Sequence, residues 1–156
     1  MTAASWSVLI YRVPSEPASK RVAIWRDLKR LGALYLQQCV CILPRIGGVH
    51  DHLERIAAKI PGMGGEYTLF DAPSLRPEDE TRIVESFRGL RNKEYAEIVE
   101  ECQTQFLKEV EFEHFRQNYS FEEAEEIRQD VEKIRRWFDQ VQERDWFGGD
   151  RRGEVT

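Results

Sequence analysis

The sequence predicts an α+β fold in which strands alternate with helices first and helices alone follow. Short β-favouring runs and amphipathic stretches alternate from residue 6 to about residue 70. After Asp71 the apolar residues keep helical spacing only. The chain has 156 residues, of which 41% are apolar, so it is long enough for one domain or for one domain with an appendage.

The first strand and helix are predicted from an apolar run and a capped amphipathic stretch. Trp6–Val13 has little polar alternation, which is typical of a central strand covered on both faces. Ser19 can cap the following helix, and Gly32 can end it. The apolar residues of this helix share one face: Ile24, Leu28 and Leu31.

The next elements complete a small sheet. Leu34–Leu43 favours strand structure, with Cys39, Cys41 and Leu43 on one side, and Gln37-Gln38 can divide it into two strands. Gly47 and Gly48 then lead into a helix with apolar residues at helical spacing: Val49, Leu53, Ile56 and Ile60. A last strand is predicted over Glu66–Phe70. The order βα(ββ)αβ is typical of a ferredoxin-like unit with both helices on one face of the sheet.

The remaining sequence predicts a C-terminal antiparallel helical hairpin. Pro77 suits the first helical position, and Gly89 and Asn92 are places where this helix could be interrupted. Ser120 and Glu123 form a capping-box pattern at the start of a further helix. Two apolar stripes are expected to face each other: Tyr95, Val99, Cys102, Phe106 and Val110, and Ile127, Val131, Ile134, Phe138 and Val141.

These patterns divide the chain into three parts. Residues 1–75 are predicted to be the ferredoxin-like unit, and residues 76–147 a helical tail packed on that unit or on a partner. Residues 148–156 have neither periodicity nor apolar content, so we expect a flexible end.

Composition limits the cellular setting and the partners. No apolar run approaches the ~20 residues of a membrane helix, and three cysteines without a framework of spacings favour reduced thiols. We therefore expect a cytoplasmic protein without membrane segments. The first 60 residues hold nine Lys or Arg and four Asp or Glu, a charge of +5, whereas the rest carries −10. Any surface that binds nucleic acid should therefore lie in the first half.

The first helix carries the most coherent candidate surface for phosphate contact. It consists of Arg26, Lys29 and Arg30, with Lys20 and Arg21 nearby. Such charges also occur on the solvated face of ordinary amphipathic helices, and no helix-turn-helix pattern accompanies them.

A weaker candidate is a metal site made of Cys39, Cys41, His50 and His52. Thiolate and imidazole are the ligands that zinc prefers. Alternate cysteines on a strand, however, share a face that commonly points into the core, and cysteine is among the most buried residues. We therefore expect no metal site and no cofactor.

Several segments resemble the N-terminal domain of ChrB-type chromate-resistance proteins. They are Tyr11–Ala33, Val40–Pro44, Phe87–Arg91 with Glu94-Tyr95, and Arg144–Gly148. The resemblance implies a role in chromate resistance, usually as a regulator of a chromate-efflux operon, with a separate C-terminal domain. This sequence has no counterpart of that second domain, so we expect a truncated chain or a partner that supplies it.

The leading hypothesis is a regulatory or binding domain, not an enzyme, that contacts DNA or a partner regulatory domain. A second hypothesis is a metal-dependent nuclease-like enzyme, because the front half is similar to small CRISPR-adaptation nucleases. Those nucleases place an aspartate at the end of the first strand, where this chain has Tyr11-Arg12-Val13. A third hypothesis is a structural module that forms a homodimer.

Overall fold

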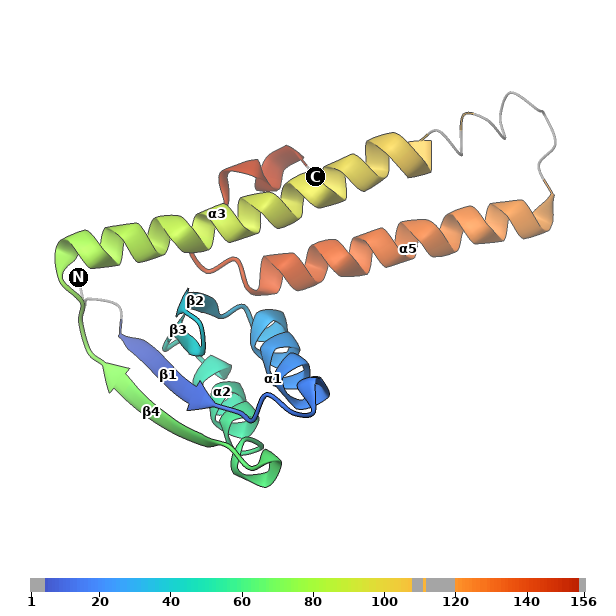
Figure 1. Cartoon of the computed structure of the whole chain (residues 1–156). Helices are drawn as coiled ribbons and strands as arrows, with labels where there is room; N and C mark the ends of the chain where they lie inside the picture. Colours follow the sequence, from blue (N-terminus) through green and yellow to red (C-terminus); the bar gives the residue numbers. More distant parts are fainter. Residues whose placement is uncertain (1–4, 108–110, 112–119, 155–156) are drawn as a thin grey trace. The chain divides into compact units, whose positions relative to one another are not determined.

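The computed structural model describes residues 5–107, 111 and 120–154. Contacts divide the chain into two compact units, residues 1–81 and residues 82–156 (Figure 1). The division falls within the first turns of α3 (Pro77–Glu101). None of the helices in the described ranges is long and apolar enough to cross a membrane.

The first unit is a four-stranded antiparallel sheet with two helices on one face (Figure 1). Its elements are β1 (Trp6–Arg12), α1 (Ala18–Leu31), β2 (Leu34–Gln37), β3 (Val40–Pro44), α2 (Val49–Ala57) and β4 (Glu66–Ala72). The strand order is β2-β3-β1-β4, so the two central strands are β3 and β1. The predicted ferredoxin-like unit is confirmed, because this is the order that the split βαβ plan produces.

The helices bury the faces that their spacing indicates. Ile24 and Leu28 of α1 are fully buried, while Leu31 is only partly buried. Gly32 ends α1 with a φ of 103° in the left-handed region, and its N–H donates to Leu28 O at 3.1 Å. In α2 the buried residues are Leu53 and Ala57, and Ile60 is buried just beyond the helix end.

Two turns set the sheet geometry. β2 and β3 are separate strands, and Cys39 lies in the turn between them with a φ of 64°. The expectation that Cys39 shares a strand face with Cys41 is therefore wrong, because the left-handed turn conformation takes it out of the strand. Gly65 precedes β4, and a Cβ there would lie 2.3 Å from Arg12 O. Only glycine allows β4 to approach β1 at this point.

The second unit is built from two long helices. α3 leads into a π-helical stretch, η2 (Cys102–Phe106), and α5 (Phe121–Glu143) follows the capping box of Ser120 and Glu123, which is confirmed. Neither Gly89 nor Asn92 interrupts α3, contrary to expectation. A side chain at Gly89 would face open space, and the side chain of Asn92 accepts a hydrogen bond from Arg151 N at 3.0 Å.

The two helices form the predicted antiparallel hairpin (Figure 1). Tyr95, Ile98 and Val141 form its buried core, and the rings of Tyr95 and Phe138 have centroids 6.0 Å apart. The partly buried residues around this core are Cys102, Ile134, Trp137 and Phe138. The predicted stripe residue Val110 and the connection at residues 117–119 lie outside the described residues.

The segment after α5 packs against α3. Gly149 N donates to Asp145 Oδ1 at 2.8 Å, and η3 (Asp150–Glu154) follows. A Cβ at Gly149 would lie 2.8 Å from Asn92 Oδ1 and 3.0 Å from the ring of Tyr95. The flexible end predicted for residues 148–156 stays a prediction. The contacts described here involve only the first residues of that segment.

Candidate functional site

The five basic residues of α1 lie on different sides of the helix. Arg26 and Arg30 are exposed and stand one helical turn apart, so they share a side. Lys29 flanks them and lies over Trp25, with Nζ 5.9 Å from the ring centroid. Arg21 lies beyond Trp25 on another side. The predicted surface is therefore a central group of three residues with Arg21 and Lys20 at its margins.

These five residues differ in their partners from Arg12, Arg45 and Lys59 of the first unit. Arg12 pairs with Glu66 at 2.6 Å, and Arg45 pairs with Asp71 at 2.5 Å. Within the described ranges, none of the five α1 residues forms an ion pair: Lys20, Arg21, Arg26, Lys29 and Arg30. Their charges are therefore available to an external anion.

Asp27 is a carboxylate within α1, and it turns toward α2. Lys59 Nζ lies 3.3 Å from Asp27 Oδ2, so this acid is engaged by a residue that follows α2. Lys29 and Arg30 occupy the last turn of α1, where positive charge suits the negative end of the helix dipole. The basic surface is thus compatible with the stability of its own helix.

The weak metal candidates are not brought together. Cys39 O accepts a hydrogen bond from Tyr11 N, whereas His50 Nδ1 lies 2.9 Å from Ser7 Oγ. Tyr11 and Ser7 are four residues apart on β1, a separation of about 13 Å. His52 bonds to Arg55 instead. Among the described residues no group of three or more His, Cys, Asp or Glu side chains could hold a metal ion.

Burial also limits the chemistry of Cys41. Its side chain is 1% exposed, and burial raises the pKa of its thiol to about 12. Since the thiolate is the form that binds metals and attacks electrophiles, Cys41 is inert at neutral pH. Of Cys39 and Cys41, Cys39 is the one that is partly exposed, so its thiol is the accessible one.

A polar chain that runs from buried Ser7 to exposed Glu54 lies in the first unit and was not found from the sequence. Ser7 Oγ lies 2.9 Å from His50 Nδ1, and His50 Nε2 lies 3.0 Å from Glu54 Oε1. Ser7 also donates to Asp71 at 3.4 Å. Because Ser7 is 1% exposed, its hydroxyl does not reach a substrate in solvent. The arrangement ties α2 to β1 and β4.

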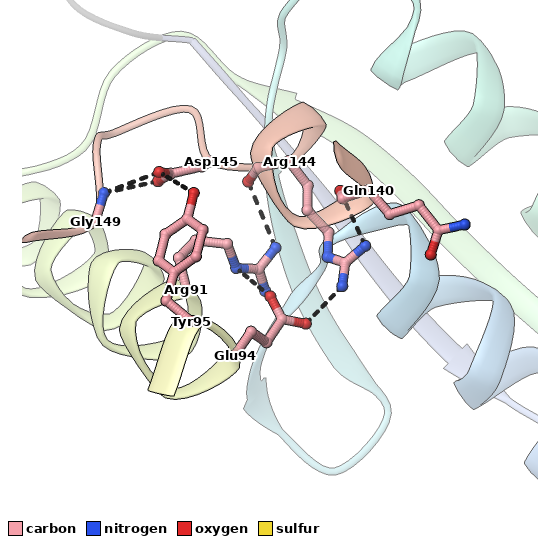
Figure 2. A network of polar contacts seen from close by, with 7 residues as sticks. All are labelled: Arg91, Glu94, Tyr95, Gln140, Arg144, Asp145 and Gly149. Atoms are coloured by element: carbon pink, nitrogen blue, oxygen red, sulfur yellow. Dashed lines mark hydrogen bonds and ion pairs between the residues drawn. The ribbon is translucent and has the colours of Figure 1, made fainter. Parts of the chain in front are cut away.

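A second polar network joins α3 to the end of α5 (Figure 2). Glu94 Oε2 lies 3.0 Å from Arg91 Nε, and Glu94 Oε1 accepts from Arg144 Nη2 at 2.6 Å. Tyr95 Oη donates to Asp145 Oδ2 at 2.7 Å. The Arg91 side chain is 5% exposed, and burial lowers the pKa of its guanidinium while Glu94 opposes this change. The network therefore compensates a buried charge.

An aromatic cluster continues this junction. The Phe87 ring lies 6.0 Å from that of Trp146, edge to face, and 5.4 Å from that of Phe147. Arg88 Nε donates to Phe147 O at 2.9 Å. Aromatic pairs at these distances stabilise beyond their buried area.

The comparison with protein families decides the affiliation of the chain. The family model described as "Protein ChrB, N-terminal" matches residues 21–156. The chain belongs to this family. Protein ChrB of Cupriavidus metallidurans is 28% identical over 95 residues, which are 60% of this chain and 28% of that protein's length. No solved structure matches.

Membership in the ChrB N-terminal family explains why two distant segments resemble that family. The pieces Phe87–Arg91 with Glu94-Tyr95 and Arg144–Gly148 are the two sides of the network in Figure 2 and of the aromatic cluster. Each piece is degenerate as a sequence pattern. The structure shows that they act as one junction, in which each segment supplies the partners of the other.

Proposed function

We propose that this chain is a non-enzymatic regulatory module of a chromate-resistance system and that α1 contacts the phosphate backbone of DNA. Membership in the ChrB N-terminal family supports the first part. The chain spans 28% of the length of Protein ChrB from Cupriavidus metallidurans. The proposed DNA contact therefore rests on the basic residues of α1. A further ChrB-type domain, on the same or on another chain, would supply the functions that this module does not.

The observation that carries the DNA contact is the unequal pairing of basic residues. Arg12, Arg45 and Lys59 have carboxylate partners, while Arg26, Lys29 and Arg30 have none in the described part of the chain. Unpaired cations on one helix side release counterions from DNA when they bind phosphates, which makes the affinity depend on salt. Contacts of this kind fix orientation and carry no sequence preference.

The test compares two triple variants that remove the same charge. R26Q/K29Q/R30Q changes the proposed surface, and R128Q/K133Q/R135Q removes two arginines and one lysine from exposed positions of α5. Binding to a fluorescein-labelled duplex of mixed sequence is measured by anisotropy at ~50 to ~200 mM salt. We expect the α1 variant to flatten the salt slope by about 2.7, at about 0.9 for each phosphate contact.

The control triple in α5 should keep the wild-type slope, because only the total charge changes there. Equal slopes for the two variants would assign the effect to net charge and overturn the contact through α1. Absence of salt-dependent binding by the wild-type chain would overturn the DNA contact altogether.

A further inference from the structure

A pocket of about 480 Å³ opens in the first unit between α1 and the turn that joins β2 to β3. Its volume lies in the range of sites for small organic molecules. Val22 and Trp25 line it and are 44% and 50% exposed, so they form an apolar wall that is open to solvent. No carboxylate is among the described residues that line it.

The polar groups of the pocket include an unsatisfied donor. Tyr11 Oη and Tyr35 Oη lie 2.7 Å apart, and both residues line the pocket. One hydroxyl donates to the other, so a second O–H proton remains, and neither hydroxyl has another partner in the described part of the chain. Tyr11 as a whole residue is 8% exposed and Tyr35 is partly exposed, and either hydroxyl can hold the spare proton. A donor that lines a pocket and has no protein acceptor can serve an acceptor atom of a ligand.

Arg21 adds a positive charge to the same wall. It lines the pocket and has no carboxylate partner among the described residues. Burial raises the pKa of Tyr11, whereas the charge of Arg21 lowers it, so the guanidinium lies within electrostatic reach of the hydroxyl pair. Burial also raises the pKa of Tyr35, and both phenols therefore stay protonated donors at neutral pH.

We propose that this pocket binds a small organic carboxylate with an apolar body. The carboxylate accepts hydrogen bonds from Arg21 and from the pair Tyr11 and Tyr35, and the apolar body packs against Val22 and Trp25. A bare tetrahedral oxyanion is a poorer fit, because it would leave most of the apolar lining without a partner. This binding site adjoins the proposed DNA contact, because Arg21 belongs to both and Lys29 lies over Trp25. Arg26 and Arg30 do not line the pocket.

The test uses 2-naphthoate as the probe, 2-naphthamide as its neutral counterpart, and sulfate as an oxyanion without an apolar body. Calorimetry on the full chain gives the affinities. Alkylation by iodoacetamide, read by peptide mass spectrometry, reports the site directly, because Cys39 lines the pocket. We expect 2-naphthoate to bind more tightly than 2-naphthamide and to protect Cys39. Cys102, in the second unit, serves as the unprotected reference.

Two variants distinguish loss of the Arg21 charge from loss of the folded pocket. Arg21→Gln should weaken 2-naphthoate about tenfold or more and leave 2-naphthamide unchanged, which also shows that the pocket is intact. Arg26→Gln is the matched control on the same helix and should bind both probes as the wild type does. Equal affinity of the wild type for the two probes, unprotected Cys39, or displacement of 2-naphthoate by equimolar sulfate would each overturn the proposal. Loss of DNA binding with intact probe binding would overturn only the proposed function.

Discussion

Replacing Glu94 by glutamine tests the physical account of the second unit most directly. The Glu94 carboxylate contacts two guanidinium groups, with 3.0 Å to Arg91 Nε and 2.6 Å to Arg144 Nη2. The exposed fractions are 5% for the Arg91 side chain, 15% for that of Arg144 and 26% for that of Glu94. Removing one partner of a buried pair costs ~3–5 kcal/mol, because an uncompensated charge stays behind. Since Glu94 keeps some contact with water, the expected loss is about 3 kcal/mol.

The assay is urea unfolding followed by the far-ultraviolet circular dichroism of the helices, with thermal unfolding beside it. For a chain of this length a loss of about 3 kcal/mol lowers Tm by ~6–12 °C. Glu85→Gln is the matched control, because Glu85 lies on the same helix and pairs with Arg88 at 2.7 Å but is 62% exposed. It should cost less than ~1 kcal/mol. Losses within ~0.5 kcal/mol of each other for the two variants would refute the view that burial makes the Glu94 contacts matter.

Three further predictions concern single positions. Gly65→Ala should lower the free energy of unfolding by more than ~1 kcal/mol, because its Cβ would lie 2.3 Å from Arg12 O, and wild-type stability in urea would contradict the close approach of β1 and β4. Ile134→Ala should cost about 2 kcal/mol, since Ile134 packs partly buried against the core of the hairpin; a loss below ~0.5 kcal/mol would place it on the surface. Burial raises the pKa of Cys41 from about 9 to about 12. Its contribution to stability is therefore complete below pH 9 and is lost as the pH rises toward 12, and Cys41→Ala should unfold with a shallower pH dependence over that interval.

Local signals in the sequence account for most of the fold. The left-handed glycine after α1, the capping box at α5 and the spacing of Ile24 and Leu28 are short-range features, and each operates in the structure as expected. Some expectations failed for local reasons: Cys39 lies in a left-handed turn, and Ser19 lies inside α1, whose N-cap is Pro17. Another failed where a distant residue decides. Asn92 stays within a continuous helix, and its side chain bonds to the backbone of Arg151, a partner that no local pattern indicates.

For the candidate site, too, the sequence indicates some features and leaves others to the fold. The basic residues of α1 could be found from composition and helical spacing, and their role in binding stays a prediction. Which cations are neutralised could not be found from the sequence. Arg45, just after β3, meets Asp71 of β4 only because both strands pair with β1, and Lys59 meets Asp27 only through the packing of α2 on α1. Likewise, an arginine such as Arg91 is expected at the protein surface from its residue type alone. Only the partners that the fold brings to it make its burial tolerable.

The network of Arg91, Glu94 and Arg144 lies at one end of the helical hairpin, where α5 ends. Among the residues whose burial is described, the buried ones concentrate at this end, whereas Leu107 and Phe121 are 47% and 84% exposed. Backbone amides exchange with solvent fastest where few buried contacts must break. Hydrogen exchange should therefore be slowest around Tyr95 and Val141 and faster toward Leu107 and Phe121, so the hairpin opens first at the end that carries Leu107 and Phe121.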